Sequence, residues 1–267
     1  MHRLLVDTAS LAQENVTLPK DAAHHLNVLR PKPGEQIELF DGKGRTRRYV
    51  VEGKSLRASG ECATFALPAV RVTLFACVTK GSRWDWTVEK AVELGVTRIV
   101  PVLSERCIVR LASDEREAKA ERWRRVAEDA ARQSDAVWLP EVLAPVDFTS
   151  ALELVKGCGC VFVGALTNPP PRPLLAAVQC ESVQAQKSLG LFVGPEGDFT
   201  PAELEALLEI AVPASFGPTI LRAETAAIFG LSVLMGAVHA RSVERIVLQR
   251  ECLTHHRGVC YNDDVLR

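Results

Sequence analysis

Two glycine-containing turns, each followed by the start of a helix, carry residue types that could bind a small molecule. The first is LFVGPEGDFTPAELE (191–205), where Gly194 and Gly197 follow an apolar run, and the second is FGPTILRAETA (216–226). Glycines at the junction between a strand's carboxyl end and a helix leave backbone amides free to face a ligand. The same glycines could also serve the turns alone. The lysine with which a P-loop grips phosphate is absent.

Charged and hydroxyl side chains lie at the mouth of the second turn. Arg222, Glu224 and Thr225 follow one another closely where a strongly apolar helix, about 224–240, is predicted to begin. A carboxylate in the first turn of a helix also stabilises the helix dipole, and Arg222 could be its surface partner. The local residues therefore allow both a catalytic and a structural role.

The elements that must position these turns alternate between buried strands and amphipathic helices. Thr200, Pro201 and Glu203 predict a capping box with proline at the first helical position. Gly95 is placed to end a helix that Ser82 would cap. A long charged helix is predicted over 114–132. Strands are predicted at RVTLFACV, RIVPVL, CVFVGAL and SLGLFVG. This alternation predicts a mostly parallel sheet flanked by helices.

The first 70 residues have a different texture. EQIELF, RRYVVEG and ECATFAL have apolar residues at near-alternate positions with glycines between them, which predicts a small β-barrel or sandwich. Residues 1–71 carry 11 Lys and Arg against 8 Asp and Glu, whereas the remainder is net acidic. This balance permits a nucleic-acid partner without requiring one. GKGRTR is followed by another strand pattern rather than a helix, which argues against a dinucleotide loop.

Composition sets the broad class. With 47% hydrophobic and 24% charged residues the chain is an ordinary globular sequence, and no segment approaches the roughly 20 unbroken apolar residues of a membrane span. The N-terminus lacks the pattern of a secretory signal. None of the eight cysteines is in a CxxC pair, which favours reduced thiols. Cys252, His255, His256 and Cys260 fit no standard zinc-finger spacing, so we expect no metal.

Several motifs occur together in a fixed order: HHLNVLR (24–30), LFDG (39–42), KGSRWDWTVEKAVELGV (80–96), SERC (104–107), AEDAARQS (127–134), GPEGDFT (194–200) and FGPTILRAETA (216–226). In this order, which spans residues 1 to about 240, the chain resembles the 16S rRNA uridine N3-methyltransferases of the SPOUT, or trefoil-knot, superfamily. Each motif alone is weak, and the joint order is specific.

The resemblance implies an α/β fold: a SPOUT trefoil-knot methyltransferase domain (71–242) preceded by a small PUA-like β-barrel that binds RNA (1–70). The segment 243–267 remains unassigned. S-adenosylmethionine would sit in the knot, and the enzyme would be a homodimer acting on 16S rRNA in the small ribosomal subunit. By resemblance the cofactor would contact Leu166, Gly194, Pro195, Glu196, Gly197, Phe216, Gly217, Ile220, Leu221 and Thr225.

The same resemblance assigns roles in catalysis and RNA binding. The N3 atom of uridine must lose its proton, so a cation that favours the anionic base or a carboxylate that accepts the proton would help. Arg222 and Glu224 are our candidates. The cofactor carries an activated methyl group, so no metal is needed for this chemistry. The candidate RNA contacts are Arg3, His24, Arg30, Lys80 and Arg106.

The chain departs from the family pattern at four positions, which bears on these assignments. Asp198 stands where a third glycine is usual and Thr219 where arginine is common, and Arg132 and Ala136 replace a glutamate and an arginine. Asp198 can adopt the left-handed conformation more readily than most residues. The alternatives are methylation of another rRNA or tRNA nucleotide, and a noncatalytic ribosome assembly factor. A cytoplasmic location is expected, with a eukaryotic organelle as the alternative.

Overall fold

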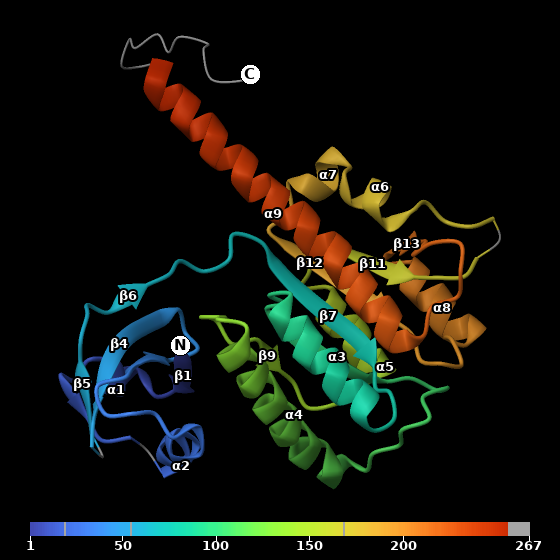
Figure 1. The fold of residues 1–267 in the computed structure, drawn as a ribbon. Coiled ribbons are helices and arrows are strands. Elements are labelled where there is room, and N and C mark those ends of the chain that lie inside the picture. Colours follow the sequence, from blue (N-terminus) through green and yellow to red (C-terminus); the bar gives the residue numbers. More distant parts are fainter. Residues whose placement is uncertain (19, 54, 168, 256–267) are drawn as a thin grey trace.

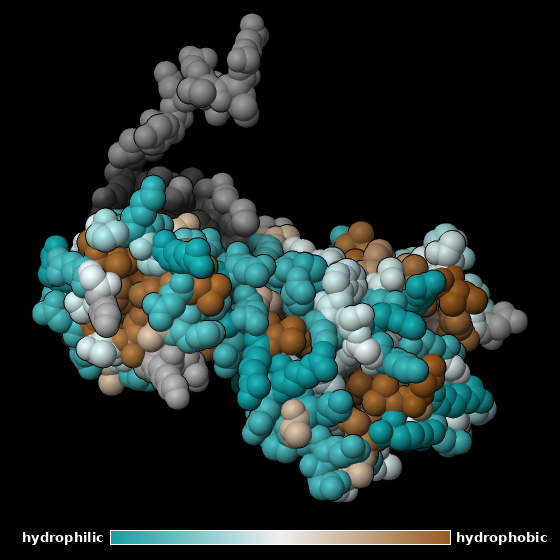
Figure 2. All heavy atoms as spheres, turned by 60° about the horizontal axis from the view of Figure 1, so that its bottom comes forward, coloured by the Kyte–Doolittle hydropathy of each residue, from teal (hydrophilic) through white to brown (hydrophobic). Residues whose placement is uncertain are grey.

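The computed structural model describes residues 1–18, 20–53, 55–167 and 169–255, with the side chains of 20, 21 and 242–255 outside the description. Two lobes are joined by an extended segment, with the N-terminal lobe below and to the left in Figure 1. Hydrophilic side chains cover most of the surface in Figure 2, and apolar side chains show as separate patches over both lobes.

The N-terminal lobe is a curved sheet around its own apolar core. Within the described residues it has six strands in the order β1-β3-β4-β5-β2, with β6 paired to β4. Tyr49 and Leu39 are fully buried inside it. The elements of this lobe are β1 (His2–Leu5), α1 (Thr8–Leu11), β2 (Asn15–Val16), α2 (Lys20–Leu29), β3 (Gln36–Phe40), β4 (Arg45–Glu52), β5 (Ser55–Ala58) and β6 (Ala63–Thr64). This lobe corresponds to the predicted PUA-like β-barrel.

Three features of this lobe differ from the prediction. Helices α1 and α2 were not expected in a region whose pattern is mostly β. The predicted strand ECATFAL contributes only the two residues of β6, because most of this segment is exposed on the way to the second lobe. Strand β5 instead pairs with β4 directly after the turn at Gly53.

The second lobe is built on a parallel sheet, as predicted. Among the described residues it has the order β10-β8-β7-β12-β11-β13, with β9 paired to β8, and all of its pairings are parallel. The strands are β7 (Arg71–Cys77), β8 (Arg98–Leu103), β9 (Glu141–Val142), β10 (Val146–Asp147), β11 (Cys160–Gly164), β12 (Ser188–Val193) and β13 (Val212–Ala214). Parallel strands are buried on both faces, which explains their continuous apolar runs.

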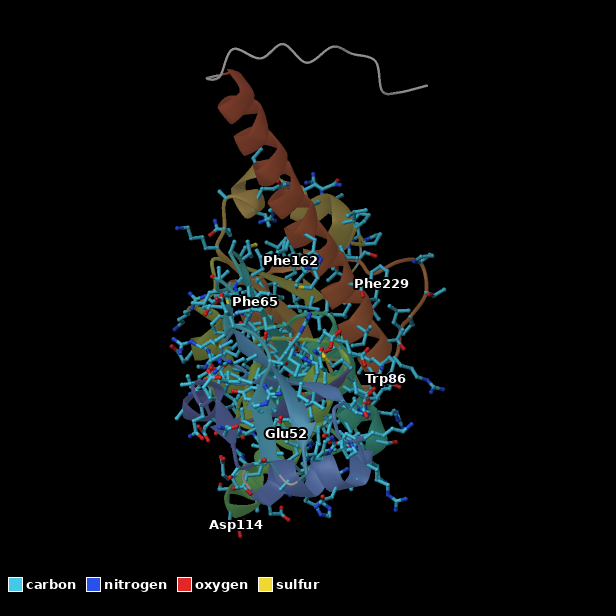
Figure 3. All side chains as sticks on the ribbon, turned by 60° about the vertical axis from the view of Figure 1, so that its left-hand side comes forward. Glu52, Phe65, Trp86, Asp114, Phe162 and Phe229 are labelled. Carbon is cyan, nitrogen blue, oxygen red and sulfur yellow. The ribbon has the colours of Figure 1, made fainter. Side chains whose placement is uncertain are left out.

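Helices cover both faces of this sheet and form two apolar cores. One face packs against α3 (Ser82–Glu93), α4 (Ser113–Gln133), α6 (Leu174–Val178) and α9 (Ala223–His255). The other packs against α5 (Phe148–Val155) and α8 (Pro201–Leu208), and the short α7 (Glu181–Gln184) follows α6. Along β7 alternate residues serve the two cores: Leu74 faces the first and Phe75 the second. Phe162, labelled in Figure 3, belongs to the first core.

The caps of the predicted helices are mostly confirmed. Thr200 accepts a hydrogen bond from Glu203 N at 3.2 Å, and Glu203 accepts one from Thr200 N at 3.0 Å, which forms the predicted capping box. Gly95 (φ 86°) follows the end of α3 as expected. The prediction for Ser82 is wrong by one position. Ser82 is the first helical residue, and the N-cap is Gly81, which has no side chain with which to cap the helix.

Helix α9 is longer than predicted and strongly apolar. Its segment Ala223–Arg241 is long and apolar enough to cross a membrane by length and composition. The core accounts for one face of this segment, because Ala227, Leu231 and Leu234 are almost fully buried against the sheet. The helix continues to His255 through the start of the unassigned segment 243–267. Residues 256–267, including His256 and Cys260, lie outside the described residues.

Backbone hydrogen bonds join the two lobes. Gly44 N donates to Val137 O at 2.9 Å, and Leu139 N donates to Gly42 O at 2.9 Å. The indole Nε1 of Trp138 donates to Ala66 O at 3.1 Å. These bonds form a short ladder between the barrel and the segment after α4, so the orientation of the lobes is set by main chain as well as side chains.

Candidate active site at the carboxyl edge of the sheet

A hollow of about 300 Å³ lies where β11, β12 and the segment after β13 meet. Of the predicted cofactor and catalytic residues, nine line it: Leu166, Gly194, Pro195, Glu196, Phe216, Gly217, Ile220, Leu221 and Arg222. The lining does not include Gly197, Glu224 or Thr225. The two glycine-containing turns, about 20 residues apart in sequence, therefore lie side by side around one cavity.

The first turn, residues 194–199, is held from behind by its neighbours. Arg106 Nη1 donates to Gly197 O at 3.2 Å and to Phe199 O at 3.3 Å. Arg83 Nη1 lies 3.3 Å from Glu196 Oε1. Asp198 adopts the left-handed conformation (φ 58°), as its type allows, and its carboxylate accepts from the following amide at 2.8 Å. The turn thus presents a fixed main chain to the hollow.

The capping carboxylate of α8 also supports this turn. Glu203 is 9% exposed, and its second oxygen, Oε1, accepts a hydrogen bond from Glu105 N at 2.8 Å. The loop after β8 is therefore fixed to the start of α8 at two points, through Glu203 and Arg106. Sequence reasoning assigned Glu203 only to the helix cap, because nothing local indicates a partner 98 residues away.

The second turn, residues 215–222, is fixed to the loop after β11. Ser215 N donates to Arg172 O at 3.0 Å, and Leu174 N donates to Ser215 O at 3.0 Å. Gly217 has φ 129°, which glycine adopts readily and other residues rarely do, and the place where a Cβ would stand is open space, with nothing within 4 Å. At the rim Ile220 is 82% and Leu166 65% exposed. Two uncovered apolar side chains beside bare main chain suit a ligand with a flat apolar part.

Arg222 and Glu224 lie next to this hollow in different environments. Arg222 is exposed on its rim. Glu224 lies in the first turn of α9, and its Oε2 is buried without a hydrogen-bond partner among the described residues. A buried polar atom without a partner is uncommon and calls for an explanation such as a ligand or a catalytic role.

The glycines have reasons other than the predicted one. A Cβ on Gly194 would lie 3.0 Å from the Phe199 ring, and a Cβ on Gly197 would lie 3.3 Å from Arg106 Cβ. These contacts are with the protein itself rather than with the hollow. The sequence allows these glycines either to face a ligand or to serve the turn alone, and these contacts show that both permit close packing within the turn.

The structure corrects one of the predicted RNA contacts. Arg3 is 4% exposed, and its side chain joins the lobes: Nε donates to Glu38 at 2.8 Å and Nη1 to Ala131 O at 2.9 Å. Its guanidinium also lies 4.3 Å from the Phe40 ring centroid. Because this side chain is almost fully buried between the two lobes, it is not accessible to a phosphate, and it holds the lobe junction together instead.

The other predicted RNA contacts are exposed and are divided between the two lobes. His24 lies exposed on α2, and Arg30 (φ 49°) follows the end of that helix. Lys80 is exposed after β7. Burial, and then the charge of Arg132, lower the pKa of the neighbouring His25, which places Arg132 close to α2. The departure at Arg132 therefore lies at the junction of the lobes, as does Ala136, whose carbonyl accepts from Arg3 at 3.2 Å.

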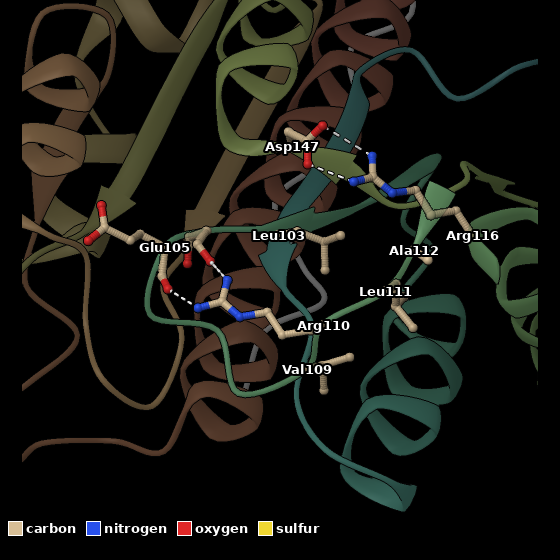
Figure 4. Close-up of a pocket in the computed structure, with 9 residues that line it drawn as sticks. Leu103, Glu105, Val109, Arg110, Leu111, Ala112, Arg116 and Asp147 are labelled. Carbon is tan, nitrogen blue, oxygen red and sulfur yellow. Dashed lines mark hydrogen bonds and ion pairs between the residues drawn. The ribbon is translucent and has the colours of Figure 1, made fainter. Parts of the chain in front are cut away.

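A second hollow, of about 400 Å³, borders the loop after β8. Its cations are already paired: Arg116 bonds both oxygens of Asp147, and Arg110 donates to the carbonyls of Ser104 and Glu105 (Figure 4). The hydrogen bonds from Arg116 lower the pKa of Asp147. The polar groups of this hollow therefore stabilise the loop after β8.

Two buried thiols lie beneath the same loop. Cys77 and Cys107 each have Sγ 3.4 Å from Ser104 Oγ. Hydrogen bonds from Cys77 and Ser104 lower the pKa of Cys107 to about 6, whereas burial raises the pKa of Cys77. The six cysteines whose side chains are described are all free, as predicted for those positions. No group of three or more potential metal ligands occurs in the described part of the chain.

Comparisons with known proteins agree with this architecture. Residues 66–235 match the RNA methyltransferase domain family, and residues 18–58 match the RNA methyltransferase PUA domain family. These matches define the class of protein as an RNA methyltransferase with an N-terminal PUA domain.

The chain is 32% identical to ribosomal RNA small subunit methyltransferase E of Synechocystis sp., over 84% of this chain and 74% of the relative. It is also 32% identical to the Mycobacterium bovis protein of that name, over 88% of each. The chain belongs to the ribosomal RNA small subunit methyltransferase E family. A crystal structure of the Neisseria gonorrhoeae member bound to S-adenosyl methionine has a TM-score of 0.75 and 30% identity, covering 88% of this chain and 97% of that one.

Proposed function

We propose that the protein uses S-adenosylmethionine to methylate N3 of a uridine in 16S rRNA, within the assembled small ribosomal subunit. Family membership supports rRNA methylation. The cofactor site and the catalytic residues are proposed from the hollow that the two turns share, with Arg222 on its rim and Glu224 beside it. The proposed cofactor contacts are Leu166, Gly194, Pro195, Glu196, Phe216, Gly217, Ile220 and Leu221. Gly197 and Thr225 would act indirectly, since neither lines the hollow.

The residues present fit this cofactor. The exposed apolar side chains of Leu166 and Ile220 could cover the faces of an adenine, and main chain from 194–196 and 217 offers hydrogen bonds to its polar groups. When bound, the cofactor supplies an activated methyl group. The protein's task is then to hold the uracil ring in line with it.

Two side chains would control the proton on the base. The Arg222 guanidinium, exposed on the rim, would favour the anionic form of the uracil and so lower the pKa of its N3–H. The unpaired Oε2 of Glu224 would accept the proton. Asp198 and Thr219 both line the hollow, so these two departures from the family pattern face the proposed cofactor rather than the barrel.

We further propose that the active unit is a homodimer formed through the outer face of α9. Phe229 on α9 and Trp86 on α3 are each 41% exposed, and their two helices pack against each other. Figure 3 shows both side chains on the same side of the molecule. Phe229→Glu should shift the mass measured by light scattering from dimer to monomer, whereas an unchanged dimer would place the interface elsewhere. A cytoplasmic location would follow from ribosomal RNA as the substrate.

The test of function uses small subunits from cells lacking the protein, incubated with the enzyme and labelled S-adenosylmethionine. Mass spectrometry of the digested rRNA should show one N3-methyluridine. Methylation of another nucleotide would contradict the proposed target, and failure to bind the cofactor in calorimetry would favour a noncatalytic assembly factor. Glu224→Gln should lower kcat by about 10²- to 10⁴-fold with cofactor affinity retained. The matched control is Glu209→Gln, an exposed carboxylate after α8.

A further inference from the structure

A pocket of about 450 Å³ lies at the carboxyl end of β7, between the starts of α3 and α4 and the loop 108–111. It shares no lining residue with the hollow assigned to the cofactor. Residues next to its walls nevertheless touch the cofactor turn: Arg83 pairs with Glu196, and Arg106 donates to Gly197 O. The two cavities are therefore neighbours along one edge of the sheet.

Two buried hydrogen-bond donors in this pocket are unpaired. Thr79 is 3% and Trp84 2% exposed, and both line the pocket. Within the described part of the chain neither Thr79 Oγ1 nor Trp84 Nε1 has a hydrogen-bond partner. A buried donor without a partner destabilises the folded state, so each such group needs a reason. An acceptor supplied by a ligand would be that reason.

The charged groups of the pocket leave an excess of positive charge. Its two carboxylates are already committed, because Asp85 pairs with Arg122 and Glu115 accepts from Ala112 N at 3.0 Å. Lys80 and Lys119 also line the pocket, and no ion pair is found for either among the described residues. The pocket therefore offers donors and cations to a ligand that is rich in acceptors and negatively charged.

We propose that this pocket holds one unstacked nucleotide of the substrate RNA, adjacent to the uridine presented to the methyl donor. Thr79 and Trp84 would donate to acceptors of the base, and Lys80 and Lys119 would contact its phosphates. A base flipped toward the cofactor leaves its neighbours unstacked, and this pocket lies where such a neighbour would be. The inference rests on the proposed function, since it assumes an RNA substrate at the adjacent hollow.

The deciding variant is Thr79→Val, which removes the hydroxyl and keeps the shape of the side chain. Because the hydroxyl has no partner in the free protein, the variant should unfold at the same temperature as the wild type or higher. Its affinity for rRNA should nevertheless fall by about 3- to 10-fold, the effect of one lost hydrogen bond. The dependence of binding on salt should be unchanged, and so should affinity for S-adenosylmethionine.

Lysine variants test the phosphate contacts separately. Lys80→Gln and Lys119→Gln should each reduce the slope of log K against log salt by about one, as expected for one lost phosphate contact. Lys187→Gln, at an exposed position before β12, is the control and should leave the slope unchanged. The measurement is filter binding of a 16S rRNA fragment over a range of salt concentrations.

The outcomes separate this inference from the proposed function. If Thr79→Val binds RNA as tightly as the wild type, the pocket holds no nucleotide, even where the lysine variants bind weakly. If Lys80→Gln and Lys119→Gln keep the salt slope of the wild type, as Lys187→Gln should, then these lysines do not contact phosphates. Wild-type protein that binds RNA with the expected variant effects but methylates no uridine would overturn the proposed function and leave the pocket supported. Wild-type protein that binds no RNA would overturn both.

Discussion

Arg106 is the most informative single residue, because sequence and structure assign it different roles. The sequence predicts an RNA contact, whereas the structure shows its guanidinium donating to the carbonyls of Gly197 and Phe199 in the cofactor turn. Arg106→Ala removes both bonds and leaves the turn less constrained. If these two hydrogen bonds hold the turn in its binding conformation, the variant should lower the affinity for the cofactor and leave RNA binding unchanged.

The size of the effect follows from the two bonds. They are long, 3.2 and 3.3 Å, and the arginine is exposed, so each should contribute about 0.5–1 kcal/mol, the lower part of the usual range. A loss of about 1–2 kcal/mol corresponds to a dissociation constant for S-adenosylmethionine raised by about 5- to 30-fold. Calorimetry measures this constant, and kinetics should show a raised KM for the cofactor with kcat nearly unchanged.

Two comparisons make the result decisive. Arg106→Lys keeps the charge and loses the fork of donors, so it should not restore cofactor affinity fully, although it would restore most of a simple phosphate contact. Arg125→Ala, an exposed cation on α4, is the control. Our reasoning would be refuted if Arg106→Ala bound the cofactor normally while its RNA binding weakened and lost about one unit of salt slope.

Three further variants test how the fold is held together. Arg3→Ala leaves the largely buried Glu38 without its partner and should lower the free energy of unfolding by about 3–5 kcal/mol, measured by denaturant unfolding. A change below about 1 kcal/mol would mean that Arg3 does not join the lobes. Glu203→Ala keeps the N-cap Thr200 but removes the bonds from Thr200 N and from Glu105 N in the loop after β8, and it should lower stability by about 2–4 kcal/mol. A loss of only about 1 kcal/mol would mean that only one of these two bonds contributes. Gly194→Ala places a methyl group against Phe199 and should lower the melting temperature even without cofactor, so an unchanged value would show that the ring moves freely.

The sequence predicts the second lobe well because its signals are local. RIVPVL matches β8 at both ends, and the capping box at Thr200 places the start of α8. The N-terminal lobe was predicted less well. Helix α2 has Ala22, Leu26 and Leu29 on one face at a helical spacing, but it is short and bounded by β-like segments. Helix α1 is a single turn that Asp7 caps by accepting from Ser10 N at 2.9 Å.

Contacts between distant segments could not be predicted in this way. Arg106 and Gly197 are 91 residues apart and Arg3 and Ala131 are 128 apart, and neither pair shares a local pattern. An arginine has the same appearance in a sequence whether it binds RNA or carbonyl oxygens. Its partners depend on which strands lie next to each other, which is decided by the whole sheet. For the same reason the unpaired donors of Thr79 and Trp84 become visible only in the fold.

The glycines of the first turn are explained by packing within the protein. Gly194 and Gly197 are needed because Phe199 and Arg106 press against the back of the turn, and of these three turn glycines only Gly217 has open space where a Cβ would lie. The shape of the first turn is therefore set by packing behind it, and what it presents to the hollow is main chain. A binding surface made of main chain is insensitive to the identity of neighbouring side chains as long as its backbone angles are kept. This explains how Asp198, which adopts the left-handed angle itself, can occupy the usual glycine position with the turn intact.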